Sequence, residues 1–293
     1  MTTAGTRGQA ATSLTPPGWA GVGTCALGEV ESSVDDALTA PWRPAFHALL
    51  LATAGHGTVE VDFAAQPCRP GTLLWIRPGQ ALRIASNGLA ASVVTFDQRL
   101  AGDHWPERPD TPTRWQLEGE DEDAVISEFA QIAVDCDRHR GGPLAADLLR
   151  YQLTVLLLRI ALLTREPGPG GAEARTFARF RRRLESSHSE SRRVEDYAEE
   201  MGCSVRTLTR ASLAVTGRTA KQVVDDRVAL EARRLLACTP MSVAEVGRYL
   251  GFPEPTNFGR FFHREVGMSP GQFRSEAALD GRATIPEQRR PAD

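Results

Sequence analysis

The last hundred residues of the chain contain one pattern twice, and this repeat constrains the fold more than any other feature. The segment VEDYAEEMGCS aligns with VAEVGRYLGFP at an offset of about 49 positions, so that Val194 matches Val243 and Gly202 matches Gly251. Each copy predicts an apolar-faced helix, a turn at the glycine and a second apolar-faced helix. We therefore expect two helix-turn-helix motifs, at about 194–213 and 243–264.

Small residues within each copy agree with this geometry. Ala198 and Gly247 stand in the middle of the first helix, where the second helix would cross it and leave room only for a small side chain. Gly202 and Gly251 accept the positive φ that the tight turn requires. In the first copy, Ser204 can cap the second helix.

The second helix of each copy has one apolar and one polar face. Leu208 in the first copy, and Phe258 and Phe262 in the second, predict the buried face. The residues expected to point outward are Arg206, Thr209 and Arg210 in the first copy and Thr256, Asn257 and Arg260 in the second.

The segment between the copies sets their separation. Ala220 to Leu236 is a continuous helical pattern, and about 17 residues at 1.5 Å each give a length of roughly 25 Å. With the flanking turns, the two outward helices would lie roughly 30–35 Å apart, close to one turn of B-DNA. Arginine can recognise guanine, asparagine can recognise adenine, and threonine methyls can contact thymine. The repeat therefore predicts a domain that reads double-stranded DNA.

Charge is unevenly distributed, although the formal net charge is only −3. From Thr176 to the end there are about 20 basic and 16 acidic residues, so this part carries roughly +4 and the rest roughly −7. Basic residues concentrate at Arg179, Arg181, Arg182, Arg183, Arg192 and Arg193. Two interpretations remain open for this arginine cluster, a solvated helix face or a set of phosphate contacts.

The amino-terminal part has a different pattern. Residues 1–20 are rich in Gly, Thr, Ala and Pro and predict a disordered tail. Residues 21–120 predict short strands: the apolar run AFHALLLATAG, the alternating GTVEVDF, two strands around Arg77-Pro78-Gly79-Gln80, and ASVVTFD. Short strands at turn-rich spacing favour a β-sandwich or barrel.

Helical periodicity begins at about residue 121. Helices are expected at Asp121–His139 and Leu144–Thr164, and the second has an apolar stripe formed by Leu149, Leu153, Leu156, Leu157, Ile160 and Leu163. This stripe could pack on the barrel of its own chain. A linker is expected at 166–175, a helical domain at 176–278 and a flexible tail at 279–293. The predicted fold class is α+β and multidomain, with an all-α carboxy-terminal domain.

The carboxy-terminal third resembles the AraC/XylS family of transcriptional regulators over roughly Thr176–Ala277. The motifs that carry the resemblance are Arg227…Ala232…Leu235-Leu236, Val243-Ala244-Glu245-Val246, Gly251-Phe252, Asn257 to Phe262, and Gly267-Met268-Ser269-Pro270…Phe273-Arg274. The resemblance implies base contacts by Arg206, Thr209, Arg210, Pro255, Thr256, Asn257 and Arg260. The chain departs from the family pattern at Ala220, Gly247 and Asn257, where proline, alanine and an aromatic residue are usual.

The amino-terminal half resembles the cupin-like sensor domain of the same family, through Phe46-His47, Gly55-His56-Gly57, Pro70 to Leu74, and Arg77 to Gln80. The resemblance implies that this domain binds a small effector and that helices 121–165 form a homodimer. We consider His47, Trp75 and Arg77 candidate effector-binding residues, with core packing as the alternative for His47 and Trp75.

Catalysis is not expected. A catalytic cupin holds a metal with a close H-x-H pair, whereas this chain offers His47, His56, Glu60 and a distant His104. No Ser/His/Asp or Cys/His set emerges, and five scattered cysteines do not suggest disulfides or a thiolate metal site. We expect no metal or cofactor, no membrane segment and a cytoplasmic location.

The prediction is thus a DNA-binding transcriptional regulator that responds to a small molecule. The family resemblance favours an activator that works with RNA polymerase. Two alternatives remain: a regulator whose barrel serves only assembly or protein contacts, and a metal-dependent cupin enzyme with a helical appendage.

Overall fold

The computed structural model describes residues 14, 16–27, 41–85, 88–100, 113–139, 141–163 and 171–280. They form two compact units. The β-domain comprises the described residues up to 163, and the helical domain comprises residues 171–280. This division confirms the α+β multidomain fold class.

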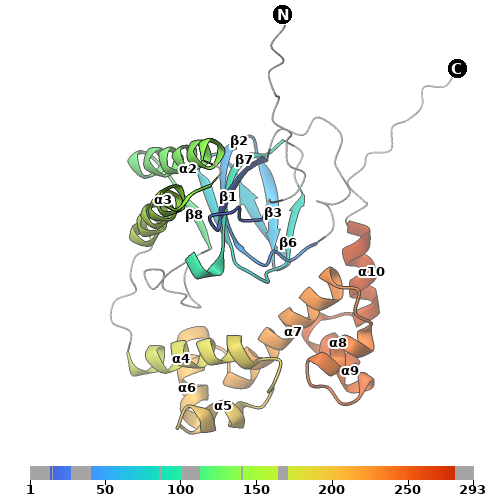
Figure 1. Cartoon of the computed structure of the whole chain (residues 1–293). Coiled ribbons are helices and arrows are strands. Elements are labelled where there is room, and N and C mark those ends of the chain that lie inside the picture. Colours follow the sequence, from blue (N-terminus) through green and yellow to red (C-terminus); the bar gives the residue numbers. More distant parts are fainter. Residues whose placement is uncertain are drawn as a thin grey trace, which may run out of the picture. The chain divides into compact units, whose positions relative to one another are not determined.

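The β-domain is built from two antiparallel sheets (Figure 1). The larger sheet has the strand order β1 (Val22–Leu27), β7 (Ala90–Phe96), β2 (His47–Ala54), β5 (Thr72–Ile76), β8 (Arg114–Gln116). The smaller sheet has the order β4 (Ala64–Cys68), β3 (Gly57–Val61), β6 (Leu82–Ala85). A short 3-10 helix, Gln98–Leu100, follows β7.

Strand β2 is buried on both faces, which explains why its sequence is a continuous apolar run rather than an alternating one. On one face, Ala48 and Leu50 join a cluster that includes Val59 and Leu82 of the smaller sheet. On the other face, Leu49 joins a cluster with α2 and α3. The domain therefore has an inner core between the sheets and an outer core beneath the helices.

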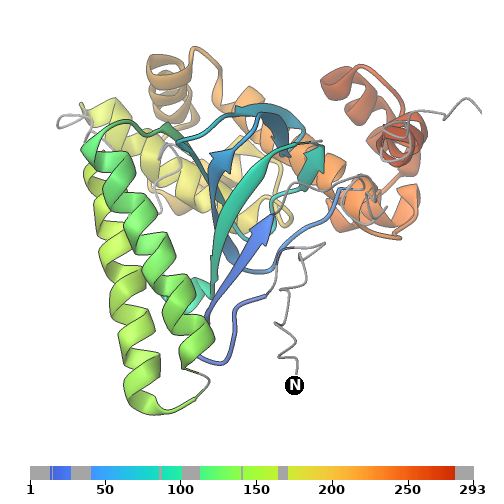
Figure 2. The ribbon, with the colours of Figure 1, turned by 90° about the horizontal axis from the view of Figure 1, so that it is seen from above.

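Helices α2 (Glu120–Arg138) and α3 (Pro143–Leu163) lie side by side along the larger sheet (Figure 2). The predicted leucine stripe of α3 is buried in the outer core, with the exception of the partly buried Leu163. Of the two interpretations left open by the sequence, packing on its own domain is therefore the observed one. Dimerisation through this stripe is wrong, because the stripe is already covered.

Two predicted boundaries differ from the structure. Leu14 and Ala20 are buried in the β-domain cores, so part of the predicted 1–20 tail is packed; the other residues up to 13 lie outside the described chain. Helix α4 begins at Ala172, inside the predicted 166–175 linker, because Phe177, Phe180 and Leu184 supply a buried helical face. Most of the predicted tail from residue 279 also lies outside the described chain.

The helical domain contains seven α-helices within residues 171–280. They are α4 (Ala172–Ser187), α5 (Val194–Glu200), α6 (Val205–Thr216), α7 (Ala220–Cys238), α8 (Val243–Tyr249), α9 (Pro255–Val266) and α10 (Pro270–Asp280). The pairs α5–α6 and α8–α9 are the two predicted helix-turn-helix motifs, and α7 connects them (Figure 1).

Candidate nucleic-acid interface

The first motif forms as its sequence requires. Gly202 adopts φ 65° in the turn after α5, and the Ser204 side chain accepts a hydrogen bond from the Thr207 amide at 3.1 Å. Leu208 is fully buried, and Tyr197 of α5 packs edge-on against Phe180 of α4 at 5.7 Å between ring centroids. The buried side of α6 is thereby fixed against α4 and α5, and its opposite side faces solvent.

The second motif uses a more aromatic core. Ser242 and Glu245 form a reciprocal capping box at the start of α8, and Pro255 occupies the first turn of α9, where a missing amide hydrogen costs nothing. A Cβ added to Gly247 would lie 3.1 Å from the Cβ of Phe258, which confirms the expected close helix crossing. Gly251 has φ 75° in the turn.

The predicted base-contacting residues are presented on the solvent side of α6 and α9. Six of them are exposed and Thr209 is partly exposed; the exposed ones are Arg206, Arg210, Pro255, Thr256, Asn257 and Arg260. The opposite faces are buried through Leu208 and Ala211 in α6 and through three phenylalanines in α9. Each of these two helices therefore exposes hydrogen-bond donors and a threonine methyl group, the kinds of group that direct readout of base edges uses.

Arg210 has an intramolecular partner that the sequence did not reveal. Its Nε lies 3.6 Å from Oε1 of Glu173, which belongs to the first turn of α4. The Arg210 side chain is 70% exposed and that of Glu173 is 41% exposed. The carboxylate therefore competes with any other acceptor for this guanidinium.

Helix α7 connects the two motifs, and it contributes both to an apolar core and to a buried charge network. Thr219 and Gln222 form a capping box at its start, and Val224, Val228 and Ala232 are fully buried. The prediction of a continuous helix from Ala220 is confirmed, with its end at Cys238 rather than at Leu236.

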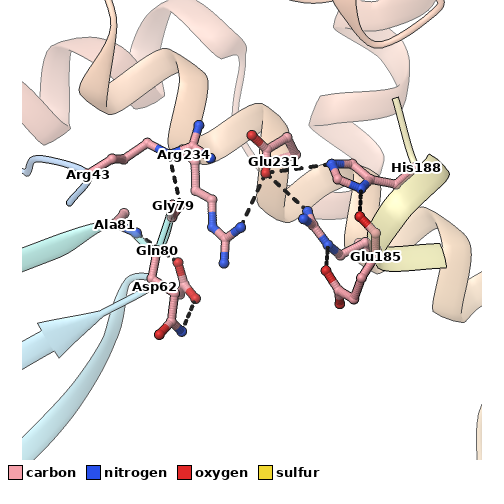
Figure 3. Close-up of polar contacts among 10 residues, drawn as sticks. Arg43, Asp62, Gly79, Gln80, Ala81, Glu185, His188, Glu231 and Arg234 are labelled. Carbon is pink, nitrogen blue, oxygen red and sulfur yellow. Dashed lines mark hydrogen bonds and ion pairs between the residues drawn. The ribbon is translucent and has the colours of Figure 1, made fainter. Parts of the chain in front are cut away.

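The charge network centres on Glu231, which is 4% exposed (Figure 3). Arg227 and Arg234 contact its Oε2 at 3.1 and 3.2 Å, and Arg227 also donates to Glu185 of α4 at 2.7 Å. His188 Nε2 lies 3.8 Å from the same oxygen, and burial together with the charge of Arg227 lowers the pKa of this imidazole. The network joins the end of α4 to α7. Arg227, which belongs to the motif shared with the AraC/XylS family, therefore stabilises the packing of these two helices.

The arginines between positions 179 and 193 do not form one continuous basic surface, because several of them have partners within the helical domain. Arg183 is hydrogen-bonded to Glu200, Arg193 is paired with Glu195 at 3.7 Å, and Arg192 donates to the carbonyl of Gly251. Arg179 and Arg182 line an open depression together with Arg183, Ser186, Glu200 and Met201. Part of the cluster thus serves contacts within the helical domain.

In the β-domain, the three candidate effector residues lie together. Trp75 Nε1 donates to His47 Nδ1 at 3.1 Å, and the Arg77 guanidinium lies 4.8 Å from the centre of the Trp75 ring. His47 also stacks on Phe96 with 4.9 Å between centroids. Trp75 and Phe96 belong to the outer core beneath α2 and α3, so the group lies outside the inner core between the sheets.

The residues considered as ligands of a catalytic metal lie in different environments. Glu60 is bound to Arg83, His47 is fully buried against Trp75, and His56 is exposed. His104 lies outside the described residues. Within the described ranges, no group of three His, Cys, Asp or Glu side chains is placed to hold a metal ion. In the same part of the chain, no helix is long and apolar enough to cross a bilayer.

A two-sheet domain that is followed in the chain by two helix-turn-helix motifs is typical of a class of two-domain regulators. Residues 31–165 match the model of an AraC-like ligand binding domain, and residues 197–276 match that of a helix-turn-helix domain. The chain belongs to the AraC/XylS family.

Its relatives include two named activators. It is 31% identical to the HTH-type transcriptional activator RhaR of Enterobacter sp. (strain 638) over 150 residues, which are 51% of this chain and 52% of the relative. It is 31% identical to RhaS of Salmonella arizonae over 181 residues, 60% of each chain. The chain thus spans about half the length of the first of these relatives. The crystal structure of ToxT from Vibrio cholerae O395 aligns with 87% of this chain and 96% of its own, at 11% identity and a TM-score of 0.45.

Proposed function

We propose that this protein is a sequence-specific DNA-binding transcriptional regulator, and that it acts as an activator. The observation that carries the proposal is the exposure of base-reading side chains on both α6 and α9, while the opposite faces of these helices are buried. The names of the RhaR and RhaS relatives support activation. The proposal places the protein in the cytoplasm, with access to DNA and RNA polymerase, and assigns it no enzymatic role.

Five of the seven exposed and partly exposed residues have an assigned base contact in this proposal. Arg206, Arg210 and Arg260 recognise guanine O6 and N7, and Asn257 recognises adenine. The methyl group of Thr209 contacts thymine. Replacing an arginine that grips a guanine costs about 1–3 kcal/mol of binding free energy and relaxes base choice at one position.

A mobility-shift assay tests this proposal with the full chain and DNA from upstream of its own locus. We expect a specific complex that survives bulk competitor DNA, and a weaker, less selective complex for Arg210→Ala and Arg260→Ala. Arg138→Ala is the matched control, because Arg138 is an exposed arginine of α2. The proposal fails if no sequence is bound above competitor, or if the control weakens binding as much as the two substitutions.

We further propose that the β-domain binds a small molecule, as its match to the AraC-like ligand binding domain supports. His47, Trp75 and Arg77 would then connect the larger sheet with α2 and α3 and thereby transmit occupancy. A ligand that binds only the folded state raises apparent stability. A thermal-shift screen of small molecules on the full chain should therefore identify at least one stabilising compound, and that compound should alter DNA binding.

A homodimer is part of the proposal, but through a different face of α3 from the predicted one. Its exposed apolar residues are Leu144, Leu148, Tyr151, Val155, Leu158 and Leu162. Their spacing alternates between four and three residues, which is the pattern of a coiled-coil seam. Leu144 and Leu162 are 84% and 86% exposed, so a second copy would remove a large apolar surface from water.

The exposed apolar face of α3 also favours the alternative in which the β-domain serves assembly. Sedimentation analysis tests whether this face forms a dimer. Leu158→Glu should shift a dimer to a monomer, whereas Leu213→Glu on α6, which alters a leucine of similar exposure (46% against 44%), should not. A dimer that persists in Leu158→Glu contradicts this interface.

A further inference from the structure

Arg192 links the two helix-turn-helix motifs directly. It lies in the segment between α4 and α5 of the first motif, and its Nη2 donates to the carbonyl oxygen of Gly251 at 2.7 Å. Gly251 belongs to the turn of the second motif, 59 residues further along the chain. The guanidinium carbon also lies 3.7 Å from the centre of the Phe252 ring. One side chain therefore makes a polar and an aromatic contact with the same turn.

Both ends of this contact are anchored. On the Arg192 side, the neighbouring Ser191 carbonyl accepts a hydrogen bond from the buried Tyr197 of α5 at 2.7 Å. On the other side, Phe252 is 4% exposed and contacts Phe258 and Phe261 of α9 at 5.4 and 5.0 Å between centroids. A displacement of Arg192 would thus be transmitted to the cores of both motifs.

The surroundings strengthen the contact. Desolvation by burial lowers the pKa of the Arg192 guanidinium from its ordinary value, which indicates partial exclusion from water. Hydrogen bonds to charged donors and cation–π contacts are both stronger where water is excluded.

We propose that Arg192 is a positioning residue that fixes the angle between the two motifs, and so sets the spacing at which α6 and α9 meet DNA. This inference rests on the proposed function. Helix α7 connects the two motifs. Because it has one motif at each end, the angle between the motifs depends on the contacts that each motif makes with its end of the helix. Arg192 adds a second connection off the helix axis. Its role lies in geometry and not in a phosphate contact of its own.

Arg193 provides a matched control for charge. It is the next residue, its side chain is 74% exposed, and its ion pairs with Glu195 and Asp196, at 3.7 and 4.0 Å, stay within the first motif. If Arg192 acted only through positive charge near DNA, Arg193→Ala would have an equal effect.

A DNA-free measurement tests the positioning role by itself. Spin labels at positions 206 and 260, in a cysteine-free full-length background, report the distance between the two recognition helices. We expect a narrow distance distribution that broadens in Arg192→Met and stays narrow in Arg193→Ala. Phe252→Leu, which keeps an apolar side chain but removes the ring face, should broaden it as well. Unchanged distributions in both Arg192→Met and Phe252→Leu overturn the inference.

A binding measurement then tests the consequence. The probes are a duplex with the complete footprint of the wild-type chain and a duplex in which the half covered by the second motif is scrambled. Arg192→Met should lose about tenfold or more in affinity for the complete site and less than about twofold for the half site. It should also discriminate less against a one-base-pair insertion between the halves. Equal losses on both duplexes indicate a phosphate contact and overturn the inference, whereas a wild-type chain without any footprint contradicts the proposed function instead.

Discussion

The buried imidazole of His47 makes the stability of the β-domain depend on pH. His47 is fully buried, accepts a hydrogen bond from Trp75 and stacks on Phe96. Desolvation by burial, followed by the positive charge of Arg77, lowers the pKa of His47 from 6.5 to about 4. The folded domain therefore holds the neutral ring, whereas the unfolded chain binds a proton below about pH 6.5.

The sign and magnitude follow from linkage. Because the pKa of the folded state is the lower one, this contribution is fully present above pH 6.5 and is lost as the pH falls toward 4. Integration between pH 7 and pH 5 gives a loss of about 2 kcal/mol in the free energy of unfolding, and the full shift corresponds to about 3 kcal/mol.

Tryptophan fluorescence during urea denaturation measures this loss in the β-domain, because all five tryptophans precede residue 116. His47→Gln keeps an acceptor for Trp75 but does not titrate, so its stability should fall by about 2 kcal/mol less than that of the wild type between pH 7 and pH 5. His56→Gln, at an exposed histidine, should retain the wild-type pH dependence. Identical pH dependence in the wild type and His47→Gln would refute the reasoning.

Two further predictions concern the helical domain. Gly247→Leu should destabilise the second motif by about 1–3 kcal/mol, since even a Cβ would lie 3.1 Å from Phe258, whereas Gly259→Ala, with nothing within 4 Å, should stabilise α9 by up to about 1 kcal/mol. Hydrogen exchange in α8 and α9 measures both, and shifts in the same direction would contradict the packing argument. Glu173→Gln should free Arg210 and raise affinity for specific DNA by no more than about fivefold, because the pair is exposed. The gain should disappear in an Arg210→Ala background, and a gain that persists there would assign it to bulk charge.

The organisation of the helical domain was predictable because its signals are local. Helix faces repeat every three or four residues and turn glycines have fixed places in the motif, so both helix pairs and their exposed residues follow from spacing alone. The strands of the β-domain were harder to predict from the sequence. The run from Ala48 to Ala52 predicted a buried strand, but β4 contains proline and glutamine and lacks apolar alternation. Its position depends on pairing with β3, a contact that sequence periodicity does not encode.

The faces of α3 show where local patterns stop being sufficient. A helix that is apolar on most of its circumference predicts burial, but the pattern does not assign each face to its partner. In the structure, Leu149 and Leu153 cover the sheet, and Leu158 and Leu162 remain exposed on another side. The excess of apolar surface beyond what the β-domain covers is the physical basis for the proposed second copy.

The contacts of Arg192 and Arg210 were beyond prediction for a related reason. Both side chains pair with residues that are distant in sequence, Gly251 and Glu173, and neither pair has a characteristic spacing. The spacing of arginines on a helix or loop therefore indicates where positive charge lies. It does not indicate whether a given arginine pairs within the protein or remains exposed to a ligand. The structure divides these side chains into those occupied inside the domain and those presented on α6 and α9. Because Arg192 is occupied and Arg206 is presented, removal of the first should change the geometry of binding and removal of the second should change the bases that are read.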